Sequence, residues 1–331
     1  MGLFSSGRSS AKPVPTRERD PRVDEAYLLL NAGEETWSAA DAAARSFGRF
    51  LGLRSASAKY EEAADYFQRA GNHFKLAKRW KLAGEAYRRT ADCLLKLKDH
   101  EHEAASAYVD AANCLKKSDA DPAAAITALE SAIAIHTERG RFGMAARLAK
   151  EVAEIHEVLT QDETPDSNST ARSLAVAEAY QRAADLYLGE EARSHANSCL
   201  LKVAQYYALA GDYAHAIDTF EQVARQSLES SLLRYHAKDS LQRAALCHLC
   251  ASDEVGAERA LNQYAQWDAS FGGSREQRFV SEVMAAVASG DVDAFTQVVF
   301  DYDAVSKLDP WKTSVLLRIK NQMRHAEEDV T

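Results

Sequence analysis

Small and apolar residues recur at a fixed spacing between about residue 60 and about residue 264. Each unit has an anchor residue, a small residue four positions before it and another small or apolar residue three positions after it. The ten anchors are Phe67, Tyr87, Tyr108, Leu129, Ala149, Tyr180, Leu200, Phe220, Leu241 and Leu261, and alanine stands four positions before nine of them. Because offsets of three and four share one face of an α-helix, the pattern predicts one helix per anchor, packed closely through alanine.

The distances between successive anchors predict a regular array with one interruption. Eight of the nine steps are 20 or 21 residues, the length of one helix plus a tight turn, or half of a two-helix repeat. The remaining step is 31 residues and contains "LTQDETPDSNSTA" (159–171), which has the composition of a loop. "WKLAGEAY" (80–87) matches the start of a tetratricopeptide motif, with alanine in place of leucine. We therefore expect an all-α fold, a tetratricopeptide-like, right-handed helical solenoid with a C-terminal helical bundle.

Other patterns flank this array. The first 22 residues are rich in arginine, serine and proline, which predicts a basic flexible tail. An amphipathic helix over 23–45 would open a solenoid that occupies residues 23–275. The C-terminal cap, residues 276–325, would contain three helices, at 276–289, 292–306 and 311–325. Residues 326–331 would form an acidic tail.

The stretch "SFGRFLGLRS" (46–55) interrupts this series of polar-surfaced helices. It places Phe47, Phe50, Leu51 and Leu53 beside two glycines, which are unfavourable in a helix interior. The sequence therefore predicts an apolar loop over residues 46–57. One interpretation is that the four side chains cap the end of the solenoid core.

Composition and charge narrow the class of partner. The chain is 46% hydrophobic, too apolar to be disordered throughout, and its net charge of -9 argues against sequence-independent binding along nucleic acid. Five scattered cysteines and the absence of a signal-peptide pattern favour a cytoplasmic protein without a disulfide framework. The apolar runs are far shorter than a bilayer span requires. Met1-Gly2 followed by Ser6 fits the N-myristoylation pattern at Gly2, although an unmodified tail remains the alternative.

Two clusters could carry chemistry. "DHEHEA" (99–104) contains two histidines and three acidic residues, but it falls at a predicted turn and its alternate residues would point to different faces of a helix. Cys247 and Cys250 lie in an apolar helical run without a second cysteine pair, so buried packing is favoured over zinc binding. The phosphate-binding, nucleophile-elbow and zinc-protease motifs do not occur in the sequence. We expect no enzymatic activity, no metal and no cofactor.

Basic residues and the C-terminus offer better candidates for function. Seven basic residues fall near helix ends or on repeat helices: Lys75, Lys78, Lys116, Lys117, Arg141, Arg147 and Lys202. They would attract an acidic protein partner, unless they are ordinary solvated side chains. The C-terminal helix carries apolar and basic residues and ends in an acidic tail, which could bind a basic patch on a partner or be a frayed end.

Several stretches together resemble the soluble NSF attachment proteins (SNAPs), of the alpha type. These stretches are "FGRFLGL", "FKLAKRW", "AYVDAANCLKKSD", "GRFGMAARLAKEVAEIHE", "AKDSLQRAALCH", "YDAVSKLDPW", "LLRIK" and "EED", in unbroken order over roughly residues 24–331. The resemblance implies an adaptor that binds the four-helix bundle of SNARE proteins, which are syntaxin-like, and recruits the hexameric NSF ATPase to take that bundle apart in vesicle fusion. It also implies a cytoplasmic protein that associates peripherally with membranes.

The resemblance assigns roles to individual residues. It implies that Phe47, Phe50, Leu51 and Leu53 insert into the bilayer and that the seven basic residues contact the SNARE bundle. One lysine expected before "GEE" is Leu188 here. The implied contacts with the ATPase are Leu316, Leu317, Arg318, Lys320, Glu327, Glu328, Asp329 and Val330.

The sequence departs from the family pattern a second time, near the C-terminus. An acidic cluster is largely replaced by "AAVASG" (285–290), which leaves Glu282, Asp291 and Asp293 as candidates for contact with the ATPase. The alternative function is a tetratricopeptide-type scaffold in a trafficking coat or tethering complex. Such a scaffold would be indifferent to loss of the acidic tail.

Overall fold

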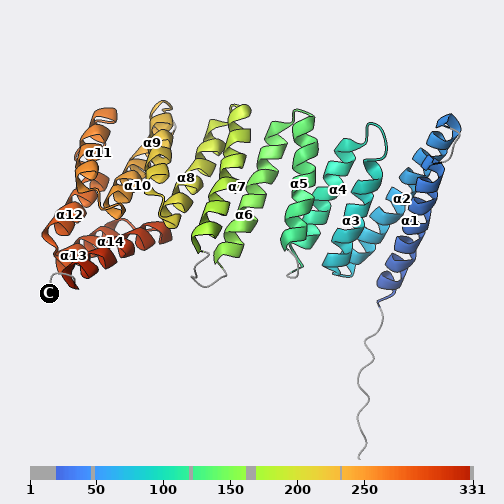
Figure 1. Ribbon diagram of the computed structural model, residues 1–331, viewed down its shortest axis with the longest axis horizontal. Coiled ribbons are helices and arrows are strands. Elements are labelled where there is room, and N and C mark those ends of the chain that lie inside the picture. The colour runs from blue at the N-terminus through green and yellow to red at the C-terminus, as the bar shows by residue number, and fades with distance from the viewer. Residues whose placement is uncertain (1–19, 46–48, 119–121, 162–168, 232, 329–331) are drawn as a thin grey trace, which may run out of the picture. The chain divides into compact units, whose positions relative to one another are not determined.

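Helices are the regular secondary structure of the described part of the chain in a computed structural model of the protein (Figure 1). The structure describes residues 20–45, 49–118, 122–161, 169–231 and 233–328. Within these ranges there are 14 α-helices and one short 3-10 helix, and no strand. The expected all-α fold of repeated helices is therefore confirmed.

The chain divides into two compact units, Met1–Ala128 and Leu129–Thr331. The helices of the first unit are α1 (Pro21–Arg45), α2 (Arg49–Leu76), α3 (Trp80–Leu94) and α4 (Glu101–Leu115), and α5 (Pro122–Glu138) contains the boundary. The second unit continues with α6 (Phe142–Gln161), α7 (Ser169–Gly189), α8 (Arg193–Ala210), α9 (Tyr213–Leu228), the 3-10 helix η1 (Arg234–His236), α10 (Ala237–Cys250), α11 (Glu254–Trp267), α12 (Arg275–Ser289), α13 (Val292–Val305) and α14 (Pro310–Glu328).

The predicted repeat pattern corresponds to the packing. The ten anchors lie one per helix on α2 to α11, and all ten are buried. The residue four positions before each anchor is fully buried as well. Glycine allows a still closer approach at Gly84 on α3, because a Cβ atom there would lie 2.6 Å from Leu115 Cγ on α4. Small residues thus set the distance between neighbouring helices within each unit.

Helix boundaries follow local sequence signals. Proline stands at the first position of α1, α5 and α14, where its missing N–H has no helical partner to lose. Asp212 and Asp253 accept hydrogen bonds from the backbone of the first turns of α9 and α11. Gly211 and Gly290 end α8 and α12 in the left-handed conformation. These signals hold the tight turns at the 20-residue spacing.

Helices in the structure extend into several of the predicted loops and tails. The apolar loop expected over 46–57 is wrong from Arg49 onward, because α2 begins there and carries Gly52 inside its first turns. One glycine costs a helix about 1 kcal/mol, which a 28-residue helix packed against its neighbours tolerates. Helices α6 and α7 extend into the predicted 159–171 loop from both sides, to Gln161 and from Ser169.

Both termini also contain more helix than expected. Helix α1 begins at Pro21, inside the predicted 1–22 tail, and the Asp20 side chain accepts a hydrogen bond from the Arg22 backbone at 3.0 Å. Helix α14 continues to Glu328, inside the predicted 326–331 tail. The sequence offers no glycine or proline between Trp311 and Thr331 that would end this helix early.

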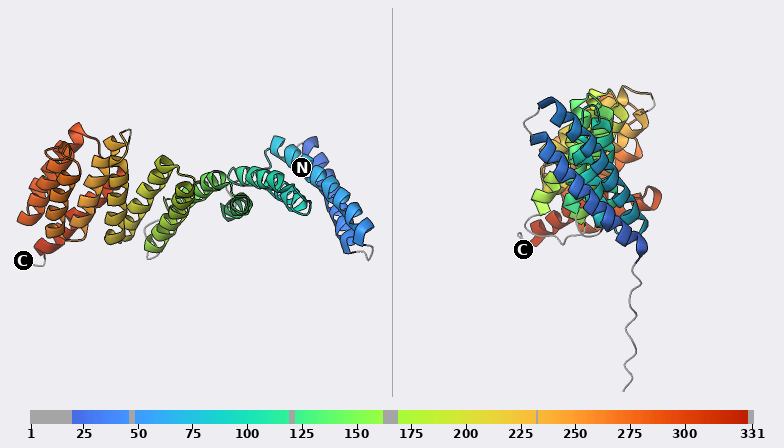
Figure 2. Two further views of the ribbon diagram at one scale, coloured as in Figure 1. Left: turned by 90° about the horizontal axis from the view of Figure 1, so that it is seen from above. Right: turned by 90° about the vertical axis from the view of Figure 1, so that its right-hand side faces the viewer.

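The C-terminal helices of the second unit share one core. Helix α10 is buried on nearly all sides, and residues of α9, α11, α12, α13 and α14 join its apolar cluster. Their yellow, orange and red ribbons lie next to one another in Figure 1 and in the left view of Figure 2. Helix α14 lies along α10, with Lys312 bonded to Asp239 near one end of α10 and Gln322 bonded to the Cys250 carbonyl at the other. These contacts place the candidate C-terminal residues against the end of the repeat array.

Candidate functional site

Four of the candidate basic residues gather at one end of the first unit. We call Lys75, Lys78, Lys116 and Lys117 the first basic cluster; all four side chains are exposed. Lys75 lies in the last turn of α2, Lys78 in the turn before α3, and the two others directly after α4. Because α3 runs between α2 and α4, the C-terminal ends of α2 and α4 come to the same end of the unit.

Aromatic rings hold two of these lysines. Lys117 Nζ lies 4.9 Å from the centroid of the Trp80 ring, and Lys75 Nζ lies 5.8 Å from that of Tyr87. A cation over an aromatic face is attracted by the negative face of the ring, and the partial negative charge at a helix C-terminus also favours lysine there. The cluster is therefore a preformed basic surface.

The other three basic candidates lie in the second unit. Two of them are exposed and the third is paired with a carboxylate. Arg141 directly precedes α6 and Arg147 lies on it, and both side chains are exposed. Lys202 on α8 is instead paired with Glu157 of α6, with 2.7 Å between Nζ and Oε1. The exposed arginines can meet a partner directly, whereas part of the Lys202 charge is already neutralised inside the unit.

Glu157 is the centre of a small polar cluster. Its other carboxylate oxygen accepts a hydrogen bond from the Tyr180 hydroxyl of α7 at 2.5 Å. Burial raises the pKa of Glu157, but the bonds from Lys202 and Tyr180 outweigh it, so that the pKa lies below its usual value. Burial and the negative charge of Glu157 raise the pKa of Tyr180 well above normal. The ionised carboxylate thus ties α6, α7 and α8 together.

Leu188, where the resemblance implies a lysine, lies near the end of α7. Its side chain is 38% exposed. The substitution therefore places an apolar group on the surface rather than in the core. Compared with the implied lysine, leucine at this position removes one positive charge from the second unit.

The predicted membrane contacts fall where few side chains are described. Phe47 and Gly2 lie outside the described residues. Phe50, Leu51 and Leu53 belong to the first turns of α2, where only the backbone is described. No helix in the described part of the chain combines the length and the hydropathy needed to cross a bilayer.

The C-terminal candidates divide into core and surface residues. Leu316 is 3% exposed and belongs to the apolar core, whereas Leu317 is 57% exposed. The Arg318 guanidinium donates hydrogen bonds to the carbonyl oxygens of Ala208 and Leu209, at 3.0 and 2.6 Å, and so caps the end of α8. Leu316 and Arg318 therefore hold α14 in place.

The remaining C-terminal candidates are Lys320 and the residues of the acidic tail. Lys320 donates a hydrogen bond from Nζ to Thr296 Oγ1 of α13 at 2.7 Å. Glu327 and Glu328 are described only as helical backbone, and Asp329 and Val330 lie outside the described residues.

The upstream acidic candidates have distinct roles. Asp291 caps α13 by accepting hydrogen bonds from the backbone N–H groups of Asp293 and Ala294. The side chains of Glu282 and Asp293 are exposed. Only two of the three carboxylates are thus fully available at the surface.

Sequence reasoning missed a buried polar network between α10, α13 and α14. Lys312 donates to Asp239 at 2.5 Å and to Gln242 at 2.7 Å, and Arg243 bonds to Asp239 and Asp309. Burial raises the pKa of Asp239, but the charges of Arg243 and Lys312 hold it below its usual value. The sequence feature that could have predicted this network is the presence of charged residues on otherwise apolar helix faces, in the stretches "AKDSLQRAALCH" and "LDPWK".

The two clusters considered for metal binding lie in different surroundings. His100 directly precedes α4, and its Nδ1 lies 2.8 Å from Oε2 of Glu103 in the first turn of that helix. Cys247 and Cys250 are buried, and burial raises the pKa of the Cys250 thiol to about 12. Among the described residues, no group of three or more histidine, cysteine or acidic side chains could hold a metal ion.

The fold and these surfaces define a class of protein: an array of paired helices that presents exposed basic residues and ends in a C-terminal helical bundle. Comparison with known sequences then identifies the family. Residues 31–324 match the family model described as "Soluble NSF attachment protein, SNAP", so the chain belongs to that family.

Named relatives agree with this assignment. The human "Alpha-soluble NSF attachment protein" is 43% identical over 85% of this chain and 90% of its own length. The protein of the same name from Vitis vinifera is 38% identical, over 90% of this chain and 96% of its own. The "Probable vesicular-fusion protein sec17 homolog" of Schizosaccharomyces pombe is 36% identical over 82% of this chain and 90% of its own. The predicted family is thereby confirmed.

Proposed function

We propose that this chain is an adaptor that binds the SNARE four-helix bundle and recruits and stimulates an NSF-like ATPase, which then separates the bundle in vesicle fusion. The single observation that carries the proposal is membership of the SNAP family over most of the chain, with relatives named for attachment to NSF. The chain itself contributes binding and positioning; the ATPase would supply the hydrolysis.

Exposed basic residues support the SNARE-binding part of the proposal. The first basic cluster and the pair Arg141 and Arg147 are exposed and positively charged in a chain whose net charge is -9. Local clusters of one sign steer an acidic partner even when the total charge is unfavourable. Lys202 acts differently in this proposal, since its pairing with Glu157 makes it a positioning residue.

The C-terminal end supports the ATPase-binding part. Leu317 is exposed, Lys320 lies beside it on α14, and the acidic residues 327–329 follow. Arg318 and the buried network hold α14 on the second unit, so a force or torque on the tail would be transmitted to the repeat helices. Membrane attachment through Phe47, Phe50, Leu51 and Leu53 is part of the same proposal, with each inserted side chain contributing roughly 1.5–3 kcal/mol. The protein would then be cytoplasmic and peripherally bound to membranes.

A disassembly assay tests this function. The full-length chain should support ATP-dependent disassembly of a preformed SNARE bundle by the NSF-like ATPase of the same organism, and a chain lacking residues 327–331 should not. The double variant Arg141→Glu/Arg147→Glu should lose bundle binding while its helical circular dichroism stays unchanged. Arg259→Glu/Lys307→Glu, which changes the net charge equally at exposed positions outside the candidate set, is the matched control.

Two results would contradict the proposal. If the full-length folded protein supports no disassembly, the scaffold function in a coat or tethering complex gains support. If Arg141→Glu/Arg147→Glu binds the bundle as the control variant does, the basic surface of the second unit is not the binding site.

A further inference from the structure

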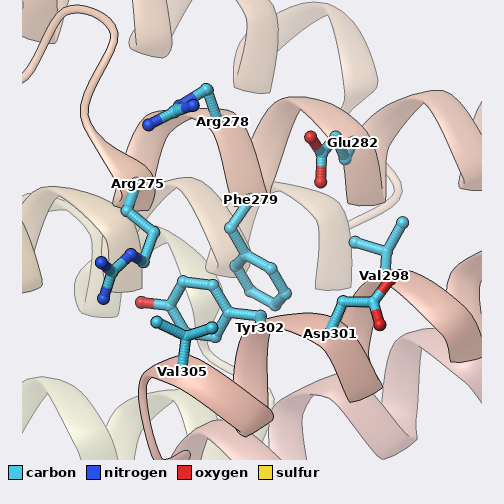
Figure 3. Close-up of a pocket in the computed structure, with 8 residues that line it drawn as sticks. All are labelled: Arg275, Arg278, Phe279, Glu282, Val298, Asp301, Tyr302 and Val305. Carbon is cyan, nitrogen blue, oxygen red and sulfur yellow. The ribbon is translucent and has the colours of Figure 1, made fainter.

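A groove between α12 and α13 in the second unit has charges of opposite sign at its two ends. Arg275 and Arg278 lie at one end and Glu282 and Asp301 at the other (Figure 3). The groove is part of the C-terminal end, for which the proposed function already names the ATPase as partner. A larger hollow of the same unit lies at a different place in the fold.

We call this larger cavity the α5–α7 hollow, because it lies where α5 and α7 end and α6 begins. It has a volume of about 350 Å³, and its lining residues are Thr137 of α5, Phe142 of α6, and Arg182, Asp185, Leu186 and Gly189 of α7. The two charged side chains already have partners. Arg182 donates to both carboxylate oxygens of Glu130 on α5 at 2.7 Å, and Asp185 accepts a hydrogen bond from Gln181 at 2.8 Å. The surface left for a partner is therefore mainly apolar, from Phe142 and Leu186.

Exposed apolar side chains continue from this hollow along its rim. Phe142 and Met144 at the start of α6 are 37% and 41% exposed, and Leu188 in the last turn of α7 is similarly exposed. The two helix ends lie against each other, since a Cβ atom on Gly143 would lie 3.7 Å from Oε2 of Glu190. Met144 and Leu188 are therefore on adjoining turns. Large apolar side chains that are exposed together mark an interaction surface.

The neighbouring charges indicate which partner this surface meets. Arg141 directly precedes Phe142, and Arg147 lies one turn of α6 beyond Gly143; both arginines are exposed. The proposed function assigns these two arginines to the SNARE bundle. A bundle that contacts both of them would also cover the start of α6 and the hollow beside it.

We propose that the α5–α7 hollow and Leu188 bind an apolar side chain of the SNARE bundle. The inference rests on the proposed function. This chain would then make an apolar contact at the position where the family pattern has a lysine. A matching bundle carries an apolar residue there, beside the acidic residues that meet the two arginines. A carboxylate at that point would lose its water against an apolar surface without gaining a cation, which is costly. Leu188 is therefore a residue that determines which bundles this chain binds.

Leu188→Lys restores the lysine of the family pattern and tests the sign of the effect. Binding of the full-length protein to a preformed SNARE bundle of the same organism is measured by calorimetry. We expect the affinity to fall about tenfold, because an apolar contact is lost although a positive charge is gained. The control is Val158→Lys, which adds the same charge at an exposed valine in the last turn of α6, the opposite end of that helix, and should not weaken binding more than twofold.

Salt separates the apolar contact from charge. At an ionic strength of about 0.5 M the attraction between exposed charges is screened, whereas the burial of an apolar side chain is not. The difference in affinity between wild type and Leu188→Lys should therefore persist at that salt concentration. Leu188→Ala changes no charge and should weaken binding about threefold at both low and high salt. Circular dichroism should be that of the wild type for both variants, because Leu188 is exposed.

The outcomes separate this inference from the function on which it rests. Leu188→Lys binding as tightly as wild type, or more tightly, overturns the apolar contact and leaves the proposed function intact. A loss that disappears at high salt, or that Val158→Lys shares, also overturns the contact. A folded wild-type protein that does not bind the bundle overturns both proposals.

Discussion

At the scale of single residues, tyrosine hydroxyls join neighbouring helices through acidic side chains. Tyr108 of α4 donates to Asp92 of α3 at 2.6 Å, and Tyr180 of α7 donates to Glu157 of α6 at 2.5 Å. Each ring fills the space between helices while its hydroxyl reaches a carboxylate at the edge, so that neither polar group is left unpaired. The anchor pattern predicted that the two tyrosine rings are buried. It did not predict the carboxylates that accept their hydrogen bonds, because the sequence does not distinguish a carboxylate that is hydrogen-bonded to a neighbouring helix from one that is exposed to solvent.

The Glu157 cluster gives a prediction about pH. The pKa of Glu157 is depressed in the folded protein, so its contribution to stability is present above the unfolded value of about 4.5 and is lost as pH falls below it. We expect Glu157→Gln to lower the free energy of unfolding at pH 7, and the difference from wild type to shrink steadily below about pH 4.5.

Urea unfolding followed by circular dichroism, at several pH values between about 3 and 7, measures this difference. Glu154→Gln, an exposed glutamate one turn away with only an i,i+4 pair to Lys150, is the control and should show little change at any pH. A pH-independent effect of Glu157→Gln would mean that its ionisation is not what stabilises the fold.

At the scale of elements, α14 packs on the repeat helices through apolar residues and through a few polar groups set among them. Lys312 is nearly buried and bonds to Asp239 and Gln242, while Trp311 donates from its indole nitrogen to the Gln205 carbonyl at 3.0 Å. These ion pairs make the position of α14 specific, since a shifted helix would leave the buried Lys312 charge without its acidic partner. The apolar periodicity predicted a helix here, but it could not select its register against α10.

Removing one partner of this network should be costly. Breaking a fully buried ion pair costs roughly 3–5 kcal/mol, and we expect Lys312→Met to cost less, about 1–3 kcal/mol, because Asp239 is half-exposed and still pairs with Arg243. The denaturation midpoint in urea measures the loss. Lys307→Met, at an exposed lysine paired with Asp303, is the control and should change stability by less than about 1 kcal/mol.

The double variant Asp239→Asn/Lys312→Met refines this test. It removes both charges, so it should be less destabilised than the sum of the two single variants. Additive losses would show that Asp239 and Lys312 do not stabilise each other.

At the scale of the whole molecule, function depends on how charge is distributed rather than on its sum. The chain is acidic overall, yet exposed basic residues occur at the end of the first unit and at the start of α6 in the second. In the proposed function, these surfaces bind an acidic bundle while the C-terminal end binds the ATPase. Long-range attraction between exposed charges is screened over about 8–10 Å at physiological salt.

Salt should therefore weaken bundle binding. We expect affinity for the SNARE bundle to fall as ionic strength rises from about 0.05 to about 0.5 M, and the fall to be smaller for Arg141→Gln/Arg147→Gln than for wild type. Binding isotherms at a series of salt concentrations provide the measurement, with Arg259→Gln/Lys307→Gln as control. Equal salt dependence in all three proteins would show that the two arginines do not face the partner.

The sequence alone determined the helical repeats, because each helix buries a face whose small and apolar residues recur every three or four positions. It also determined the family, through stretches that packing does not dictate, and the family model confirms it. Helix ends were less predictable: one glycine in α2 and the polar residues beside α6 and α7 favour loops locally, but tertiary packing extends the helices through them. Only the tertiary structure decided that Leu316 packs in the core and Arg318 caps α8. It also decided that Lys202 is paired with Glu157 and that a groove with opposite charges at its ends lies between α12 and α13. Those properties depend on which faces of distant helices meet, and helical periodicity gives the face of a residue without naming its neighbour.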